Sequence, residues 1–498
     1  MYKKTYILNP LVSENEFIKQ KPENVALPKF EDVKDKLPQV HWQDHQAHID
    51  CYWKAWEIAF SNLKQPTPES GFIKNFIDTA YNGNIFMWDT SFMMMFGIYG
   101  RRVFDFQSTL DNFYAKQHPD GFICREISAK TGQDLFHRYD LVSTGPNLFP
   151  WAEWIYFQHT SDVARLEKIF PVLVAYHKWL KEYRTWKDGS YFSSGWGTGM
   201  DNQPRLEAEY NQNFSHGHMS WLDTNLQQIL SGKILMAIGE VIERWQEIED
   251  IIDETEALEK FVNEQMYDPK TKFYYDKLKD DSLNTAKSIG AFWGLEAEIY
   301  PESRVKDMCQ YLSDDKYFKR SHMVPSLSYD DDKYNDLGRY WQGGVWAPTN
   351  YMLLKGLEKY NEHSLAFDIA LNHNTNVVKV FEATGTLWEN YAPEKIVPAK
   401  PAKPDFVGWT GLSAINVLIE NVFGIQPDVP NNEIHWHINL KDEKFGVSNY
   451  PFGENNTLKL SCDSSIIEED GFPKLEIQAE EPVTINVYFE SSKKAIKV

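Results

Sequence analysis

The stretch that decides the fold is ARLEKIFPVLVAYHKWLKEY, residues 164–183. Its apolar residues recur at intervals of three and four, the period of a helix with one buried face; they are Leu166, Ile169, Phe170, Leu173, Tyr176, Leu180 and Tyr183. The stretch LDTNLQQILSGKILMAIGEVIERWQEI, residues 222–248, repeats this pattern. The same reasoning predicts further helices at 48–62, 303–312, 348–360, 365–382 and 409–422. The chain is therefore predicted to be mainly α-helical as far as about Gly424.

Between the predicted helices lie long stretches rich in Gly, Trp and Asp. They occupy residues 81–92, 118–127, 188–205, 337–348 and 385–394. Long irregular segments in a compact domain are usually functional. Because they alternate with pairs of helices, we expect a barrel of helical hairpins with these loops at one end. No short repeat is visible, which argues against a thin solenoid.

The sequence pattern changes after Gly424. Polar and apolar residues then alternate within residues 432–440, 456–464, 473–481 and 483–491, which is the pattern of half-buried strands. We therefore predict three parts: an N-terminal arm at 1–40, a helical catalytic domain at 41–428, and a small antiparallel β-domain at 429–498.

The composition excludes several classes of protein. The 498 residues include 51 Lys and Arg against 72 Asp and Glu, a net charge of −21. A chain with this negative charge is poorly suited to bind nucleic acid or an anionic membrane surface. A few local arginines are nevertheless sufficient to hold a small anionic substrate. Aromatic residues reach 15%, and we expect part of them to line a wet cleft.

The four cysteines, Cys51, Cys124, Cys309 and Cys462, are far apart and are expected to be free thiols rather than a zinc or redox site. The N-terminus shows no signal-peptide pattern and no run of about 18 apolar residues occurs. We expect a cytoplasmic protein, or a periplasmic one if a signal was removed, that is a monomer or a small homo-oligomer.

Two acidic residues are the first candidates for chemistry. Asp201 stands in GWGTGMDNQPR, residues 195–205, where three glycines allow a tight loop; the alternative is an Asx-turn to its own backbone. Glu389 stands between Trp388 and Tyr391, where desolvation by aromatic rings raises a carboxyl pKa. The alternative for Glu389 is a surface position near a helix end.

Three other features are compatible with a sugar site. Asp89 interrupts the apolar run FMWDTSFMMMFG, and a buried acid needs partners; it is either a helix N-cap or a ligand for sugar hydroxyls. The aromatic segment YWQGGVW, residues 340–346, either walls a pyranose ring or packs in the core. His216 and His218 lack nearby cysteines or paired carboxylates, so hydrogen-bonding or structural roles are preferred over metal binding. No metal or organic cofactor is expected.

Glycoside hydrolysis requires one carboxylic acid to protonate the leaving oxygen and one carboxylate to activate water or to attack. Asp201 and Glu389 lie on loops of separate predicted hairpins. We therefore expect them to face each other across a pocket.

Several of these motifs resemble those of a known group of enzymes. GMDNQPR after Trp196, YWQGGVW, LWENYAPE and VGWTGL are similar, in this order, to motifs of the trehalase and processing α-glucosidase I group of inverting glycoside hydrolases. The likeness is greatest to the bacterial mannosylglycerate-hydrolase-like relatives and runs from about Tyr81 to Gly424. It implies an (α/α)6 barrel, with Asp201 as general acid and Glu389 as general base.

The resemblance also implies a set of residues that bind substrate, in which Trp88 and Asp89 line the subsite for the non-reducing sugar. The predicted substrate-binding residues are Trp88, Asp89, Arg125, Glu126, Asn147, Trp196, Asn202, Arg205, Asp223, Tyr340, Trp341, Trp346, Tyr391 and Trp409. Two departures from the group concern specificity: Gln342 stands where Arg is common, and Gly197-Thr198 where Glu-Ser is common.

The sequence thus predicts an inverting, exo-acting glycoside hydrolase for a short oligosaccharide or small glycoside. One alternative keeps the barrel but is a lyase or dehydratase for uronate-containing oligosaccharides. Two features suggest this alternative: Gln342, and a group of four arginines near the predicted site. These arginines either hold a carboxylate or sulfate of the substrate or make surface ion pairs. They are Arg101, Arg102, Arg125 and Arg138. A further alternative is a non-catalytic carbohydrate-binding protein.

Overall fold

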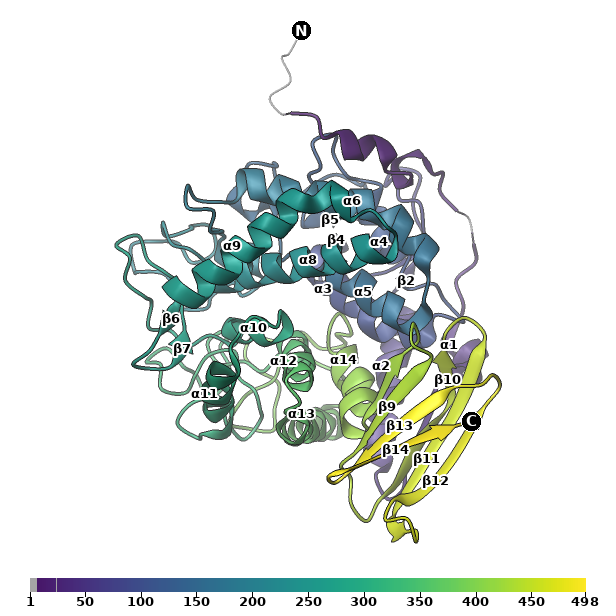
Figure 1. The fold of residues 1–498 in the computed structure, drawn as a ribbon. Helices are drawn as coiled ribbons and strands as arrows, with labels where there is room; N and C mark the ends of the chain where they lie inside the picture. Colours follow the sequence, from purple (N-terminus) through teal and green to yellow (C-terminus); the bar gives the residue numbers. More distant parts are fainter. Residues whose placement is uncertain (1–6, 24) are drawn as a thin grey trace.

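The computed structural model of the chain describes residues 7–23 and 25–498. It consists of a helical body and a β-domain beside it (Figure 1). In the body, six helices form a closed ring in which each helix contacts the next and the last contacts the first. They are α3 (Met87–Gly97), α5 (Phe149–Thr160), α8 (Leu222–Val241), α10 (Trp293–Glu296), α12 (Ala347–Lys359) and α14 (Gly411–Ala414).

A second set of helices alternates with the ring helices along the chain. It comprises α2 (Gln46–Ser61), α4 (Thr109–Tyr114), α6 (Val163–Tyr183), α9 (Glu249–Gln265), α11 (Glu302–Ser313) and α13 (His363–Thr384). Helices α6 and α9 pack on α8, α4 packs on α3, and α13 packs on both α12 and α14. The ring is thus supported by helices that are not members of it.

Most helices predicted from periodicity are confirmed: 48–62, 164–183, 303–312, 348–360 and 365–382 correspond to α2, α6, α11, α12 and α13. Two predictions need correction, one in length and one in continuity. The helix expected at 222–248 ends at Val241, is followed by Glu243 in the left-handed region (φ 58°), and gives way to a 3₁₀ turn, η6 (Trp245–Ile248). The segment 409–422 divides into α14 and a π-helical stretch, η8 (Val417–Val422).

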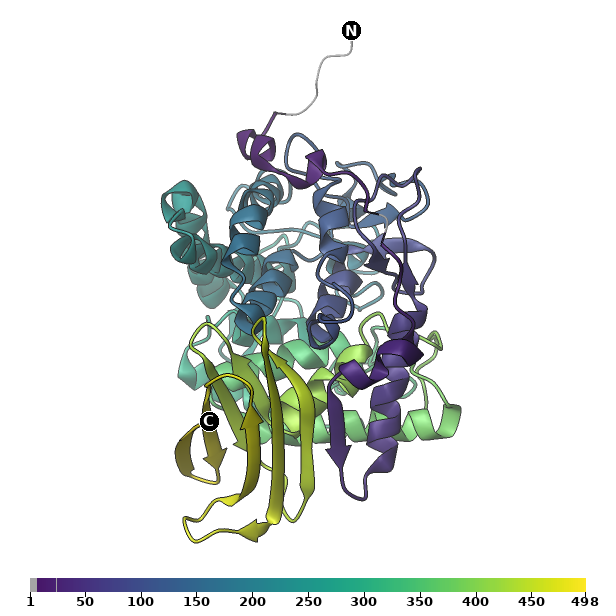
Figure 2. The same ribbon diagram turned by 90° about the vertical axis from the view of Figure 1, so that its right-hand side faces the viewer.

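The β-domain contains two four-stranded sheets (Figure 2). One has the order β1 (Gln39–Trp42), β10 (Lys444–Phe452), β11 (Asn456–Ile467), β12 (Pro473–Ala479). The other has the order β14 (Ser492–Lys497), β13 (Thr484–Phe489), β9 (Glu433–Ile438), β8 (Ile425–Asp428). Alternating apolar residues such as Ile434, Trp436 and Ile485 are buried, as the period-2 pattern requires.

The small antiparallel β-domain predicted at 429–498 is present, and most of its strand pairs are antiparallel, but three details differ. Strands β9 and β13 pair in parallel, which is possible because the whole β10–β12 segment connects them. Strand β8 begins at Ile425, inside the predicted 41–428 unit. Strand β1 comes from the N-terminal side of the chain and pairs with β10, so the β-domain is built from both ends of the sequence.

The remaining elements are short. Before β1, the arm contains η1 (Pro10–Glu14), which contacts α6, then η2 (Phe17–Lys19), α1 (Phe30–Val33) and η3 (Lys34–Lys36). Two-stranded pairs are formed by β2 (Leu63–Lys64) with β3 (Phe76–Ile77), β4 (Asn84–Phe86) with β5 (Glu126–Ser128), and β6 (Tyr267–Asp268) with β7 (Phe273–Tyr274). The other single turns are η4 (Ile98–Gly100), η5 (Leu141–Ser143), α7 (Gly195–Thr198) and η7 (Ile289–Phe292). Within the described residues, none of the helices has the length and apolar character needed to cross a membrane.

Candidate active site

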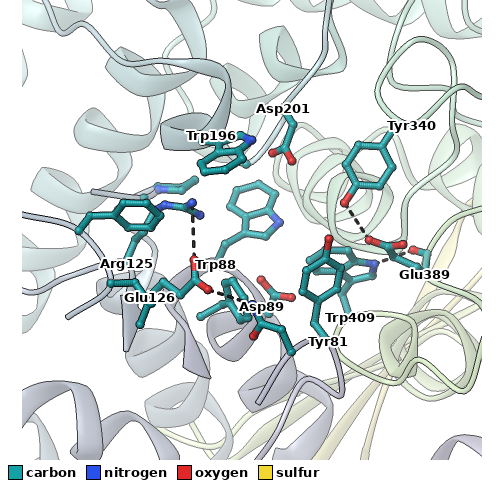
Figure 3. A pocket seen from close by; sticks show the side chains of 17 residues that line it. Tyr81, Trp88, Asp89, Arg125, Glu126, Trp196, Asp201, Tyr340, Glu389 and Trp409 are labelled. Atoms are coloured by element: carbon teal, nitrogen blue, oxygen red, sulfur yellow. Dashed lines mark hydrogen bonds and ion pairs between the residues drawn. The ribbon is translucent and has the colours of Figure 1, made fainter. Parts of the chain in front are cut away.

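A cavity of about 440 Å³ lies where several ring helices begin, and the loops that precede α3, α5, α8, α12 and α14 contribute to its wall. Nine of the residues predicted to be catalytic or substrate-binding line it (Figure 3); they are Trp88, Asp89, Arg125, Glu126, Trp196, Asp201, Tyr340, Glu389 and Trp409. The structure therefore brings together side chains that are far apart in the sequence, the first and last being Trp88 and Trp409, 321 positions apart.

Asp201 is held by a tightly turned loop. Helix α7 is capped by Ser194, whose Oγ accepts from the Gly197 N–H at 3.2 Å. The helix ends at Gly199, where φ is 74° and an added Cβ would lie 3.1 Å from the Trp88 ring. Glycine is required at that position because the backbone is left-handed and passes directly over an aromatic face.

Burial raises the pKa of Asp201 to about 7, with a further contribution from the negative charge of Glu389 and an opposing one from Arg125. The Asp201 carboxyl interacts with its own backbone N–H, which lowers its pKa. The Asx-turn alternative is wrong, because it requires a bond to the N–H two residues on, and the Gln203 N–H donates to the Met200 carbonyl instead. No other described residue donates a hydrogen bond to the Asp201 carboxyl. Near neutral pH this carboxyl is therefore able to carry a proton and to donate it.

Glu389 has a different environment. Its side chain is only 3% exposed, so the alternative of a surface glutamate is wrong. The Tyr340 hydroxyl donates to Oε1 at 2.8 Å, and the Lys403 backbone N–H donates to Oε2 at 3.1 Å. Burial raises the pKa of Glu389, while these two donors and the Lys403 charge lower it. The donors hold both oxygens of the carboxylate in place.

The first turn of α3 forms another part of the wall. Asp89 is buried, and burial raises the pKa of its carboxyl well above the ordinary value. The N-cap of this helix is Phe86 rather than Asp89, so the capping alternative is wrong. The Trp88 indole Nε1 is buried and has no hydrogen-bond partner among the described residues. Asp89 therefore retains hydrogen-bonding capacity at the cavity, and the Trp88 side chain forms part of the wall.

Arg125 and Glu126 lie on the side of the cavity opposite Glu389 (Figure 3). The Arg125 Nε donates to the Val142 carbonyl at 2.7 Å, and its guanidinium lies 4.9 Å from the Phe136 ring centre and 5.5 Å from that of Trp196. Glu126 lies 3.7 Å from the Arg125 Nη2 and accepts from Asn84 at 2.7 Å. This corner therefore offers one fixed cation and one fixed carboxylate.

Seven predicted substrate-binding residues do not line this cavity; they are Asn147, Asn202, Arg205, Asp223, Trp341, Trp346 and Tyr391. Asn202 is half-buried and lines a neighbouring surface pocket, whereas the other six are buried and make contacts within the protein. Arg205 is buried and forms ion pairs with Asp223 at 2.8 Å and Asp276 at 2.5 Å. This cluster anchors the end of the Asp201 loop to the start of α8.

The other members of this set also make internal contacts. Asn202 Nδ2 donates to the Arg339 carbonyl at 2.9 Å, and its Oδ1 accepts from the Trp341 N–H at 2.8 Å. The indoles of Trp341 and Trp346 are stacked in parallel at 4.0 Å. The Tyr391 hydroxyl accepts from the Trp388 N–H, and Asn147 donates to Gln228 and Ser231. Each of these residues therefore has a partner within the protein.

Eight lining residues were not predicted: Tyr81, Asn82, Phe86, Leu135, Phe136, Gly145, Pro146 and Gly199. Tyr81, Asn82 and Phe86 belong to the stretch 81–92, whose richness in Gly, Trp and Asp had already marked it as functional. No such pattern in the sequence marks Leu135 and Phe136 as functional. They reach the site because the segment after β5 folds back and bonds to it, the Leu135 N–H donating to the Glu126 carbonyl at 3.1 Å.

Of the four arginines considered for anionic substituents, only Arg125 lines the cavity. Arg101 donates to the Gly453 carbonyl and Arg102 to Thr457, so both attach the helical body to the β-domain. Arg138 pairs with Asp120 at 2.5 Å.

The rings of His216 and His218 pack against each other, with their centres 4.5 Å apart. The described residues contain no group of three or more His, Cys, Asp or Glu suited to hold a metal.

Comparison with known proteins found relatives that match much of the chain. A protein of Borreliella burgdorferi with no assigned function is 24% identical over 443 residues, which cover 85% of this chain and 89% of that protein. A probable mannosyl-oligosaccharide glucosidase of Schizosaccharomyces pombe is 24% identical over 293 residues, but the match spans only 35% of its length. The crystal structure of a GH63 mannosylglycerate hydrolase from Thermus thermophilus in complex with glucose superposes with a TM-score of 0.58 at 19% identity, covering 73% of this chain and 99% of that one.

A family model decides the assignment. The mannosylglycerate hydrolase MGH1-like glycoside hydrolase domain matches residues 84–400, which include both candidate carboxyls and most of the cavity wall. The chain therefore belongs to this glycoside hydrolase family and is an enzyme that hydrolyses glycosidic bonds.

Proposed function

We propose that the protein is an inverting, exo-acting hydrolase of a short oligosaccharide or small glycoside, with Asp201 as general acid and Glu389 as general base. The observation that carries the proposal is the contrast between these two carboxyls in one cavity. Burial raises the pKa of Asp201 to about 7 and leaves its carboxyl almost free of partners, whereas Glu389 is held by two donors. A pair of carboxyls with different environments is the usual basis for separate acid and base roles.

In the proposed reaction, the protonated Asp201 donates its proton to the leaving oxygen as the glycosidic bond breaks. The ionised Glu389 removes a proton from a water molecule that attacks the anomeric carbon from the opposite face. The Tyr340 hydroxyl and the Lys403 N–H keep the Glu389 carboxylate oriented toward that water. Fixing its orientation lowers the entropic cost of reaching the transition state.

The size and lining of the cavity support a substrate of one or two sugar rings. Its volume of about 440 Å³ is toward the lower end of small-molecule sites, which span about 300–1,000 Å³. The rings of Trp88, Trp196 and Trp409 offer flat apolar surfaces for pyranose faces. The Asp89 carboxyl, which also lines the cavity, would bond sugar hydroxyls.

We also propose that the body is an (α/α)6 barrel. The support is the closed ring of six helices and the alternation of ring and outer helices along the chain. In such an arrangement the loops that enter the ring helices meet at one end, which is where the cavity lies.

The proposal is tested with Glu389→Gln and Asp201→Asn on a panel of α-glucosides, α-mannosides and mannosylglycerate. We expect each variant to lose at least a thousandfold in kcat while its affinity for the released sugar changes less than threefold. Proton NMR of the first product formed by the wild-type protein should show the anomer inverted. Turnover by Glu389→Gln at the wild-type rate, or a product of retained configuration, would contradict the assignment.

A further inference from the structure

The side of the cavity that receives the leaving group follows from the proposed function. In an inverting hydrolysis, water attacks from the side of the general base, and the leaving group departs on the opposite face within reach of the general acid. Arg125, Glu126 and Trp196 lie on the side of the cavity away from Glu389 (Figure 3). Trp196 also belongs to α7, in the loop that presents Asp201. These three side chains are therefore placed to contact the leaving group.

Arg125 and Glu126 both keep unused hydrogen-bonding capacity. The Arg125 Nε donates to the Val142 carbonyl, but neither Nη donates to a described residue, and the side chain is 16% exposed. The Glu126 Oε1 accepts from Asn82 at 3.1 Å and from Asn84 at 2.7 Å. Its Oε2 accepts from no described residue and lies 3.7 Å from the Arg125 Nη2. These three unpaired atoms are accessible rather than buried, so a free donor stands beside a free acceptor in the cavity wall.

Neighbouring hydroxyls of a sugar match this pair of groups. Each hydroxyl can both donate and accept, so one hydroxyl accepts from the Arg125 Nη while the next donates to the Glu126 Oε2. A neutral diol bound in this way leaves the guanidinium and the carboxylate paired with each other. No charge is then left without a partner when water is displaced.

The charges around this corner disfavour an acidic leaving group. Among the described residues that line the cavity, Arg125 is the one Lys or Arg, and it stands against four carboxyls, those of Asp89, Glu126, Asp201 and Glu389. The Arg125 charge already lowers the pKa of both Asp89 and Asp201. A carboxylate bonded to the free Nη2 would also lie close to Glu126 and be repelled by it. The guanidinium is therefore poorly placed to select an anion.

Aromatic surface continues outward from this corner. The half-buried Trp196 ring meets the Phe214 ring edge-on at 4.7 Å and the Phe136 ring at 6.2 Å. Phe214 is 49% exposed and Leu135 is 44% exposed. Flat apolar surface of this kind suits the C–H face of a pyranose ring. A three-carbon leaving group would leave most of it in contact with water, which is unfavourable.

We infer that the leaving group is a neutral sugar ring, whose apolar face packs on Trp196 and whose neighbouring hydroxyls bond to Arg125 and Glu126. This inference rests on the proposed function, because the positions of the acid and the base set the side on which the leaving group departs. It narrows the substrate class to a neutral disaccharide or longer saccharide, in preference to a glycoside of a small organic acid. Trp196 and Glu126 are then the residues that determine this specificity.

The test compares leaving groups on one non-reducing sugar. That sugar is identified first, as the one whose α- or β-glycosyl fluoride the wild-type protein hydrolyses among D-glucose, D-mannose and D-galactose. Its disaccharides, its glycerol glycoside and its glycerate glycoside are then assayed for kcat/KM. We expect the best disaccharide to exceed the glycerol glycoside at least tenfold, and the glycerol glycoside to exceed the glycerate glycoside at least fivefold. The first ratio isolates the ring and the second isolates the charge.

Two variants assign the preference to residues. Trp196→Ala should lower kcat/KM at least tenfold for the disaccharide but less than threefold for the glycosyl fluoride, because fluoride contacts no ring. Glu126→Gln retains an acceptor for Asn82 and Asn84 but removes the charge, so it should shift the ratio of glycerate to glycerol glycoside at least tenfold toward the acid. Trp154→Ala is the matched control, since Trp154 is half-buried outside the cavity and its loss should leave every ratio unchanged.

Several outcomes would overturn the inference. A glycerate glycoside cleaved faster than the glycerol glycoside would contradict the neutral class, and a disaccharide cleaved no faster than the glycerol glycoside would contradict the ring. If Trp196→Ala lowers Tm markedly, Glu126→Gln decides, and an unchanged ratio in that variant would remove Glu126 from the site. In all these cases the wild-type protein still hydrolyses the glycosyl fluoride. A wild-type protein that hydrolyses none of the fluorides or glycosides would instead contradict the proposed function itself.

Discussion

At the scale of single residues, the two carboxyls of the proposed mechanism require opposite protonation states. Glu389 must be ionised and Asp201 protonated, so kcat/KM should rise with pH as Glu389 loses its proton and fall as Asp201 loses its own. Burial raises the pKa of Asp201 to about 7 and also raises that of Glu389 above its ordinary value. We expect a bell-shaped dependence of kcat/KM on pH, with the alkaline limb centred near pH 7. Because the two carboxyls interact, the two apparent pKa values of this profile belong to the pair and not to either residue alone.

Tyr340→Phe tests the acidic limb of this profile. The Tyr340 hydroxyl donates to the Glu389 carboxylate at 2.8 Å and favours the ionised form, so its loss should raise the pKa of Glu389 and move the acidic limb to higher pH. A hydrogen bond to a charged group contributes about 1.5–3 kcal/mol, and we expect kcat to fall about tenfold to a hundredfold. Tyr334→Phe is the matched control, because Tyr334 makes an equivalent bond of 2.8 Å to Glu394 away from the cavity. An unmoved acidic limb in Tyr340→Phe would be evidence against Glu389 as the base.

Arg125→Met tests the alkaline limb separately. The Arg125 charge lowers the pKa of Asp201, so its removal should raise that pKa and move the alkaline limb to higher pH while the acidic limb stays nearly in place. Arg102→Met removes a cation that bonds to the β-domain instead and should leave both limbs unchanged. The assignment of the acid fails if Arg125→Met shifts only the acidic limb.

At the scale of elements, the site depends on a connection between two loops. Asn202 makes two hydrogen bonds that tie the loop of Asp201 to the segment that carries Tyr340. Asn202→Ala removes both, at about 1 kcal/mol each. We expect a loss of about 1–2 kcal/mol in the free energy of unfolding, measured in urea, and a fall of at least tenfold in kcat because the acid and base lose their alignment.

The control for this loop is Asn213→Ala. The Asn213 side chain lies in the same connection between α7 and α8 but makes no side-chain hydrogen bond to a described residue. This variant should retain wild-type kcat and stability. If both alanine variants behave alike, the two loops are not coupled through Asn202.

The elements also show what the sequence allowed us to predict. Helices α2, α6 and α13 lie outside the ring and bury one face, so their apolar residues follow the helical period and reveal them. All eleven residues of α3 are buried, and most of α5 is buried too. A helix buried on every side carries no polar stripe, so periodicity cannot identify it. The ring helices with this property were therefore missed as helices, although the motifs at their beginnings were recognised.

A similar reason explains the division of the site residues. Residue type and spacing identified Asp201, Glu389, Trp88 and Tyr340, because carboxyl groups and tryptophans in glycine-rich loops are unusual. The same motifs also contain Arg205 and Trp341, which stabilise the loops from behind. A motif does not distinguish a side chain that points into the cavity from one that points away, since both are needed to form the loop.

At the scale of the whole molecule, the helical body and the β-domain share a continuous core. Trp42, at the end of β1, stacks on His45 at 4.1 Å and meets the Phe423 ring edge-on at 5.7 Å, while its Nε1 donates to Glu443 at 2.9 Å. Tyr99 and Tyr450 form a second contact across the boundary, with ring centres 5.8 Å apart. These contacts indicate that the two parts unfold together.

Trp42→Ala tests this cooperativity. Loss of a buried aromatic side chain costs about 3–5 kcal/mol, and we expect Tm to fall while calorimetry still records one transition, with helical and strand signals in circular dichroism lost at the same temperature. Trp245→Ala is the matched control, since Trp245 is 48% exposed and its removal should change stability by about 0.5 kcal/mol or less. Separate transitions for the two parts in Trp42→Ala would show that the β-domain is an independent unit.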